Sequence, residues 1–181
     1  MQAYPQRLYH NTPGWVKDGA LFHIRIRTAS DPALALTEPN LATGLLAKAA
    51  RHHELGMWWC ELFLLMPDHL HALLVFPREP GMSETIRGWK RLMARSFGIR
   101  WQENYFDHRI RNDEEAAEKW KYILLNPIVK NLCAIEDDWP WWWSCLDVSY
   151  LKWRPAASAL LVERVAPNPL VWPGGKENSD H

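Results

Sequence analysis

Two histidines one residue apart, His69 and His71, are the residues of this sequence best suited to chemistry. If they lie on a strand, both imidazoles point to one face and can reach one ion, while Leu70 packs on the other face. Imidazole nitrogen binds Zn, Mn, Fe or Ni, and Mg²⁺ can be held where phosphate oxygens and water complete its shell. The alternative is a pair of surface or internally hydrogen-bonded histidines. The position of the pair, directly after a proline-containing turn in an apolar hairpin, favours the ligand role.

Tyr122 and Asn126 form a second candidate pair on a predicted helix. Residues spaced i and i+4 share a helix face, so the phenol and the amide project side by side. A tyrosine beside a metal-bound phosphate can act as a nucleophile and form a phosphodiester that keeps the bond energy for rejoining. The alternative is that Tyr122 is a core aromatic and that Asn126 caps a helix before Pro127.

The elements that must position these residues follow from periodicity and from capping signals. Alternation predicts a strand over Leu21–Arg27, with Phe22, Ile24 and Ile26 on its apolar face. In chain order we then predict a helix capped by Asn40 and ending near Gly56, strands over 57–65 and 69–76, a helix from Ser83 to Gly98, a strand over 105–111, and a helix over 113–126 with an Asn112 and Glu115 capping box and a stop or kink at Pro127. This order predicts an α+β fold, a ferredoxin-like (RRM-like) antiparallel sheet with helices on one face.

The 181 residues fit one domain with tails. We predict an N-terminal arm over 1–19, a central domain over 20–150, and a proline-rich C-terminal arm over 151–181 that is partly flexible. The chain has no apolar run of membrane-spanning length and does not begin with a signal peptide. Its three cysteines lack C-x-x-C spacing, which argues against a disulfide framework or a cysteine zinc site. We therefore expect a cytoplasmic protein with no membrane partner.

The formal net charge of zero conceals an uneven distribution. Residues 87–111 hold seven Lys and Arg against two Asp and Glu, a local charge of +5, whereas 51–86 and 132–181 each carry −3. A phosphate backbone responds to the local field, so nucleic acid is a candidate partner. The alternative is an ordinary solvated helix face.

Four separated motifs resemble, in their order, the single-tyrosine HUH transposases of small insertion sequences, where U is a hydrophobic residue. They are Met66-Pro67-Asp68-His69-Leu70-His71, the segment 101–112, Lys121-Tyr122-Ile123-Leu124-Leu125-Asn126-Pro127, and Asp138-Trp139-Pro140. Within that family the chain looks most like the REP-associated tyrosine transposases. The resemblance covers about residues 20–145, so it makes the central domain the catalytic one.

This resemblance implies a ferredoxin-like core and a set of site residues. His69 and His71 would bind a divalent cation, Mg²⁺ or Mn²⁺, and Asn126 would occupy the third-ligand position. Tyr122 would attack the scissile phosphate of single-stranded or hairpin DNA, leaving a 5′-phosphotyrosine and a free 3′-OH. Asn126 replaces the glutamine common in the mobile branch of the family. Relatives act as a monomer or a homodimer.

The basic residues of the chain are candidates for DNA contact. The helix from Ser83 to Gly98 would hold phosphates without reading sequence, and residues nearer the site would add to it. The candidates are Arg87, Lys90, Arg91, Arg95, Arg100, His108 and Arg111. For His108 and Arg111 the alternative is strand-edge salt bridging. The cluster Trp141-Trp142-Trp143 fits core packing, base stacking or self-association.

Two rival functions stay open at this point. One is a non-catalytic module that binds single-stranded or hairpin nucleic acid by stacking bases on its sheet. The other is a small metallohydrolase in which Tyr122 is only structural. The joint presence of His69, His71, Tyr122 and Asn126 favours the transposase, because a pure binding module does not need this set.

Overall fold

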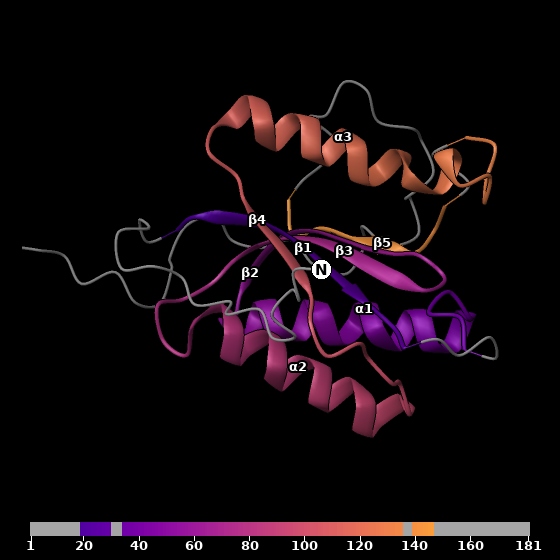
Figure 1. Ribbon diagram of the computed structural model, residues 1–181, viewed down its shortest axis with the longest axis horizontal. Helices are drawn as coiled ribbons and strands as arrows, with labels where there is room; N and C mark the ends of the chain where they lie inside the picture. The colour runs from indigo at the N-terminus through magenta and orange to yellow at the C-terminus, as the bar shows by residue number, and fades with distance from the viewer. Residues whose placement is uncertain (1–18, 30–33, 136–138, 147–181) are drawn as a thin grey trace, which may run out of the picture.

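The computed structural model describes residues 19–29, 34–135 and 139–146. Its elements, in chain order, are β1 (Leu21–Arg27), α1 (Pro39–Glu54), β2 (Trp59–Leu65), β3 (His69–Val75), α2 (Gly81–Phe97), β4 (Phe106–Arg109), α3 (Asp113–Val129) and β5 (Trp142–Trp143) (Figure 1). The predicted order of strands and helices is confirmed, with β5 as an addition. The predicted C-terminal arm, nearly all of the N-terminal arm and Asp138 lie outside the described residues.

The sheet has the strand order β4-β1-β3-β2-β5, and every neighbouring pair is antiparallel. A tight turn joins β2 to β3, closed by the Met66 amide, which donates to the His69 carbonyl at 2.8 Å. In the register of β1 against β3, Arg27 lies opposite His69 and Arg25 opposite His71. Directly opposed residues share a face of the sheet, so both histidines lie on the same face as these arginines.

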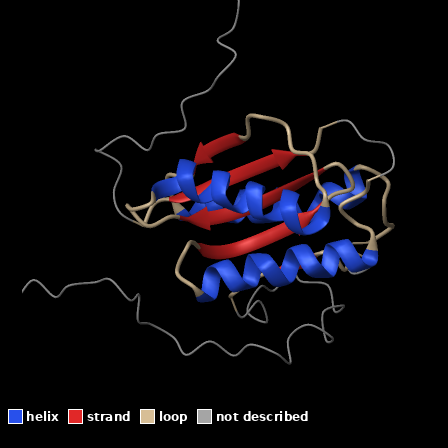
Figure 2. Cartoon of the chain, turned by 90° about the horizontal axis from the view of Figure 1, so that it is seen from below, coloured by secondary structure: helices blue, strands red, loops and turns tan. Residues whose placement is uncertain are grey.

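The face that carries Ile24, Ile26, Leu70, Ala72 and Leu74 packs against α1 and α2. Both helices lie on this side of the sheet, below it in Figure 1 and so on the viewer's side in Figure 2, which is seen from below. α1 supplies Leu41, Leu45 and Leu46, and α2 supplies Ile86, Trp89 and Met93. Trp89 is fully buried and its ring lies beside Trp58 and Phe63. This is the main hydrophobic core.

α3 lies on the opposite face of the sheet, above it in Figure 1. Trp120 and Ile123 of α3 pack against Leu62 and Leu64 of β2, and Leu73 of β3 joins the same cluster. The α+β fold class is confirmed, but the expected placement of all helices on one face holds only for α1 and α2. The physical reason is that β2 and β3 carry buried apolar residues on both faces, with Leu62, Leu64 and Leu73 on the side of α3, so each face must be covered.

The ends of the helices differ in detail from the sequence prediction. α2 begins at Gly81 rather than at Ser83. α1 is capped by Glu38 rather than Asn40, because the Glu38 carboxylate accepts from the Leu41 amide at 2.9 Å and Pro39 fills the first turn. Asn112 does cap α3, accepting from the Glu115 amide at 2.8 Å, but the Glu115 carboxylate turns to the Arg111 amide and to His108. The helix also continues past Pro127 to Val129.

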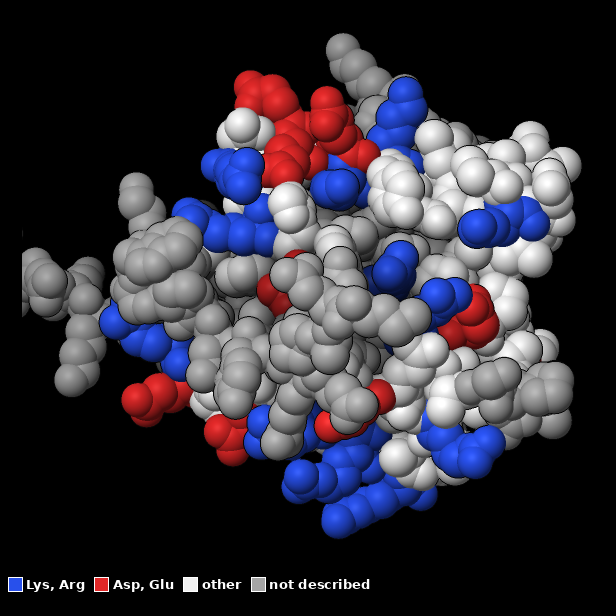
Figure 3. Space-filling view, viewed as in Figure 1, with Lys and Arg blue, Asp and Glu red and all other residues white. Residues whose placement is uncertain are grey.

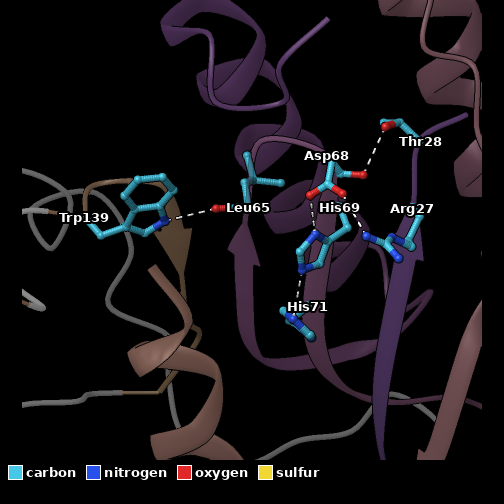
Figure 4. A network of polar contacts seen from close by, with 7 residues as sticks. All are labelled: Arg27, Thr28, Leu65, Asp68, His69, His71 and Trp139. Carbon is cyan, nitrogen blue, oxygen red and sulfur yellow. Dashed lines mark hydrogen bonds and ion pairs between the residues drawn. The ribbon is translucent and has the colours of Figure 1, made fainter. Parts of the chain in front are cut away.

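The tryptophans after α3 pack against the sheet. Trp142 and Trp143 form β5 beside β2, and Trp139 donates its indole N–H to the Leu65 carbonyl at 3.0 Å (Figure 4). Trp141 contacts both hydrophobic clusters. The structure thus supports core packing as the role of the cluster Trp141-Trp142-Trp143. Among the described residues, no helix has the length and apolar character needed to cross a membrane.

Candidate functional site

The two histidines of β3 face each other on the α3 side of the sheet. Their Nε2 atoms are 3.2 Å apart, and both side chains are buried. β3 positions them because its side chains alternate, with Leu70 and Ala72 anchored in the core behind them. The strand therefore points both imidazoles toward one place, as the spacing of the two histidines predicts.

Asp68 holds the first of these rings from the turn before β3 (Figure 4). Its carboxylate lies 2.6 Å from Nδ1 of His69 and accepts a hydrogen bond from Arg27 at 2.9 Å, while its carbonyl accepts from Thr28 Oγ1 at 3.0 Å. A carboxylate can only accept, so Nδ1 of His69 carries the proton. In neutral His69, Nε2 is then left with a free lone pair.

His23 of β1 holds the second ring. Its Nε2 lies 2.9 Å from Nδ1 of His71, and the two rings are stacked with centroids 5.2 Å apart. His23 is buried, and within the described part of the chain its Nδ1 has no hydrogen-bond partner. This bond lets His71 carry its proton on either nitrogen. When His71 donates from Nδ1 to His23, its Nε2 also presents a lone pair.

Burial keeps the three imidazoles neutral. It lowers the pKa of His71 to about 2 and that of His23 to about 4, with positive neighbours such as Arg25 adding to both shifts. Burial also lowers the pKa of His69, against an opposing effect of Asp68. Neutral imidazole is the form that binds metal ions.

The facing nitrogens fit a divalent cation. Two nitrogens bound to one ion at about 2.1 Å, at an angle between 90° and the tetrahedral value, lie about 3.0–3.4 Å apart. The distance of 3.2 Å between His69 and His71 lies in this range. Each ring also has an outer partner on its other nitrogen, as metal-binding histidines usually do.

No group of three or more His, Cys, Asp or Glu among the described residues is arranged to hold an ion. His23 does not complete one, because it meets His71 at Nδ1 rather than at the facing Nε2. A third ligand must therefore be of another type, such as an amide oxygen, water or phosphate.

Tyr122 projects from α3 toward these histidines. Its ring centroid is 6.0 Å from that of His71 and 6.2 Å from that of His23, both edge to face, and its side chain is 49% exposed. Burial of Ile123 and Trp120 on the same helix fixes α3 against the sheet and so sets this position. The structure thus brings Tyr122 and the histidine pair together, with the phenol open to a large substrate.

Asn126 lies one turn farther along α3 and is buried. Its Nδ2 donates to the Tyr122 carbonyl at 2.8 Å. That bond occupies the amide nitrogen and leaves Oδ1 as the acceptor end of the side chain. Asn126 is therefore not a helix C-cap, since α3 continues to Val129.

The residues predicted to contact DNA are divided between the two layers. The exposed side chains of Arg87, Arg91 and Arg95 lie on α2, across the sheet from Tyr122. Blue side chains gather in this region, at the bottom of Figure 3. Lys90 is held by two backbone carbonyls, those of Gln102 and Glu103, at 2.7 and 2.8 Å.

Of the remaining candidates, Arg100 is exposed just beyond the end of α2, and Arg111 is exposed directly before α3. His108 lies opposite His23 in the sheet, on the Tyr122 side, with its Nε2 2.6 Å from a Glu115 carboxylate oxygen. His108 is thus paired with a carboxylate at the edge of the sheet. The exposed arginines are the candidates whose side chains are open to phosphate groups.

Sequence reasoning missed four residues that border the site. His23, Arg25 and Phe106 lie on the α3 side of the sheet, and Lys119 has its Nζ 5.5 Å from the centroid of the Tyr122 ring. The alternation of β1 placed His23 and Arg25 on the polar face, but only strand pairing shows that this face is the one that carries His71. Lys119 could have been found from its i, i+3 spacing to Tyr122.

The sequence of the chain is similar to those of known transposases. A REP-associated tyrosine transposase of Escherichia coli (strain K12) is 24% identical over 131 residues, covering 70% of this chain and 76% of that protein. A Haemophilus influenzae protein described as a candidate REP-associated tyrosine transposase is 26% identical over 95 residues, covering 42% of this chain and 53% of its own length. No protein-family model matches the chain.

The fold has a counterpart among solved structures. The structure of a REP-associated tyrosine transposase bound to a REP hairpin superposes with a TM-score of 0.64 at 18% identity, covering 88% of this chain and all of that one. The sequence match and the shared fold confirm the resemblance that the motifs predicted. The chain is therefore similar, over 70% of its length in sequence and in its architecture, to the REP-associated tyrosine transposases.

Proposed function

We propose that this chain is a metal-dependent tyrosine transposase that cleaves and rejoins single-stranded, hairpin-bearing DNA. The observation that carries the proposal is the position of Tyr122, whose half-exposed ring lies edge to face with the rings of His71 and His23. The names of its relatives support the reaction class, and the hairpin bound to the solved relative supports the DNA partner. Residues 20–150 form the catalytic domain in this proposal, which places the protein in the cytoplasm with the DNA.

The ligand set proposed for Mg²⁺ or Mn²⁺ is His69 and His71, with Asn126 in the third position. The first two are supported by the facing Nε2 atoms and by their outer partners Asp68 and His23. The role of Asn126 is supported by its hydrogen bond to the Tyr122 carbonyl, which fixes the orientation of the amide and leaves Oδ1 to accept or to bind an ion. An ion held by these residues would neutralise charge on the nonbridging phosphate oxygens and orient the phosphate.

The chain's own residues carry the covalent step. The Tyr122 Oη forms a bond to phosphorus, and the bond from phosphorus to the 3′ oxygen breaks. The phenol proton passes to solvent, and the departing 3′ oxygen takes up a proton, leaving a 5′-phosphotyrosine and a free 3′-OH. The Nζ of Lys119 lies 5.5 Å from the centroid of the Tyr122 ring, so its positive charge is close to the phosphate that Tyr122 attacks. Attack by a 3′-OH on the phosphotyrosine reverses the step and rejoins a strand.

The side chain of Tyr122 is half exposed, so the site is open at this residue. An open site suits a nucleic-acid strand, whereas small-molecule sites are usually closed pockets. Basic side chains on α2 give the other layer of the protein an electrostatic surface for phosphates, whereas the first turn of α3 is acidic, as the blue and red regions of Figure 3 show. We therefore assign α2 to the duplex part of a hairpin. The strand that is cleaved is assigned to the region around Tyr122, which lies beyond the acidic first turn of α3. The protein acts as a monomer or a homodimer, which its mass in solution will distinguish.

The proposal is tested by incubating the full chain with end-labelled hairpin DNA and Mn²⁺ and separating the products on a denaturing gel. Wild type should form a covalent protein–DNA adduct, and Tyr122→Phe should form none while still binding DNA. His69→Ala should also lose the adduct. Binding without cleavage would instead show a stacking module, and cleavage without an adduct would show a hydrolase in which Tyr122 is structural. Either outcome overturns the proposal.

A further inference from the structure

Phe106 exposes an aromatic ring next to the histidine cluster. It begins β4, the edge strand of the sheet, and its side chain is 44% exposed. The ring centroid lies 5.7 Å from that of His23, which also contacts Tyr122. Phe106 and Tyr122 thus flank the same imidazole, one from the sheet edge and one from α3. A single exposed apolar residue is ordinary on a protein surface, so its meaning depends on its neighbours.

Arg25 lies between Phe106 and the histidines. It is opposite Phe106 on β4 and opposite His71 on β3, so the three side chains form one row across a single face of the sheet. Its guanidinium carbon lies 5.5 Å from the Phe106 ring centroid. Its Nε is buried without a hydrogen-bond partner among the described residues.

The charge of Arg25 acts on the site directly. Because Arg25 is opposite His71 in the pairing of β1 with β3, its fixed positive charge lies beside the histidine pair, where a phosphate would bind. The described part of the chain gives Arg25 no carboxylate partner, whereas Arg27, two residues on, is paired with Asp68 at 2.9 Å. Arg25 therefore keeps its charge available to an anion.

We propose that Phe106 and Arg25 form a nucleotide subsite beside the scissile phosphate: the base of one unpaired nucleotide stacks on the exposed Phe106 ring, and its phosphate contacts the Arg25 guanidinium. This inference rests on the proposed function, because it assumes single-stranded DNA at Tyr122. Stacking on an aromatic ring tolerates any base, so the subsite selects unpaired over paired DNA rather than a sequence. A duplex cannot use it, since its bases are already stacked on each other.

The test measures binding of hairpin DNA with a single-stranded extension to the full chain carrying Tyr122→Phe, so that no cleavage occurs. Each nucleotide of the extension is replaced in turn by an abasic residue. At one position, loss of the base should weaken binding about five- to 150-fold, the range for one stacked base. In Phe106→Ala the same abasic change should have no effect, and Phe106→Tyr should restore the difference. Leu55→Ala, which removes an exposed apolar side chain at the end of α1, is the matched control and should leave the abasic effect unchanged.

An equal abasic penalty in Phe106→Ala and in its parent would overturn the subsite, as would an extension with no sensitive position. Phe106→Leu keeps the test valid if the alanine variant unfolds, because leucine retains an apolar side chain without an aromatic face and should also lose the abasic penalty. Arg25→Gln should lower affinity for the intact and abasic strands alike and reduce the salt dependence of binding. These readouts do not depend on adduct formation, so failure of the subsite and failure of the Tyr122 chemistry are separate results.

Discussion

The Nε2 atoms of His69 and His71 face each other at 3.2 Å, and each ring is held on its other nitrogen by a different residue, Asp68 for one and His23 for the other. The carboxylate fixes the proton of His69 on Nδ1, whereas the imidazole of His23 lets His71 adopt either tautomer. The two outer partners therefore differ in kind, and their removal should have measurable and separable effects.

Asp68→Asn should weaken Mn²⁺ binding by about 10- to 100-fold, because it removes the charge that raises the basicity of His69. Titration calorimetry with Mn²⁺ on the DNA-free protein measures this directly. Arg27→Gln is the control: it removes the other partner of Asp68, an exposed pair worth about 0–1 kcal/mol, and should leave metal affinity nearly unchanged. Equal losses in both variants would contradict the role given to Asp68.

His23→Leu should also weaken Mn²⁺ binding, by a similar factor, because His71 then has no acceptor for an Nδ1 proton. His23→Gln retains a side chain that can accept and should recover much of the affinity. Free Mn²⁺ measured by electron paramagnetic resonance gives both values. If the leucine variant binds Mn²⁺ as wild type does, His23 is only a packing residue.

Ile123→Ala should loosen the attachment of α3 to the sheet. Ile123 is fully buried against the second hydrophobic cluster, and truncating such a side chain costs about 2–5 kcal/mol of unfolding free energy. Urea unfolding measures the loss, and adduct formation by the adjacent Tyr122 should slow. Val129→Ala, at an exposed position of the same helix, should change stability by less than about 0.5 kcal/mol.

The basic side chains of α2 should govern the salt dependence of hairpin binding. Replacing Arg87, Arg91 and Arg95 by Gln should weaken binding and reduce the slope of log Kd against log salt by about 2–3, since each phosphate contact contributes about 0.9. Lys90→Gln should leave the slope nearly unchanged, because its ammonium group is already bound to two carbonyls. A larger change for Lys90→Gln than for the arginines would contradict this assignment of α2.

Local patterns predicted most of the elements correctly. The alternation of Leu21–Arg27, the cap at Asn112 and the end at Gly98 each depend on neighbours within a few residues, and the structure has them where expected. The cap of α1 was predicted wrongly because Glu38 has an unusual side chain for that position and a proline follows it.

The second layer could not be predicted from local patterns. Its presence follows from the buried apolar residues that β2 and β3 carry on both faces. Periodicity alone does not assign a strand's two faces to particular helices. The same limit applies to the site. The spacing of His69 and His71 predicts that they share a face, but the contact with His23, 48 residues away, depends on strand pairing.

The central claim is that Tyr122 forms the covalent link to DNA. Trypsin cleaves after Lys121 and Lys130, which isolates a peptide, residues 122–130, with Tyr122 as its single tyrosine. After reaction with hairpin DNA and Mn²⁺ and digestion of the DNA, mass spectrometry should find a nucleotide phosphate on Tyr122 of this peptide. A nucleotide linked to any other residue, or a peptide that stays unmodified while the DNA is cut, would contradict the account.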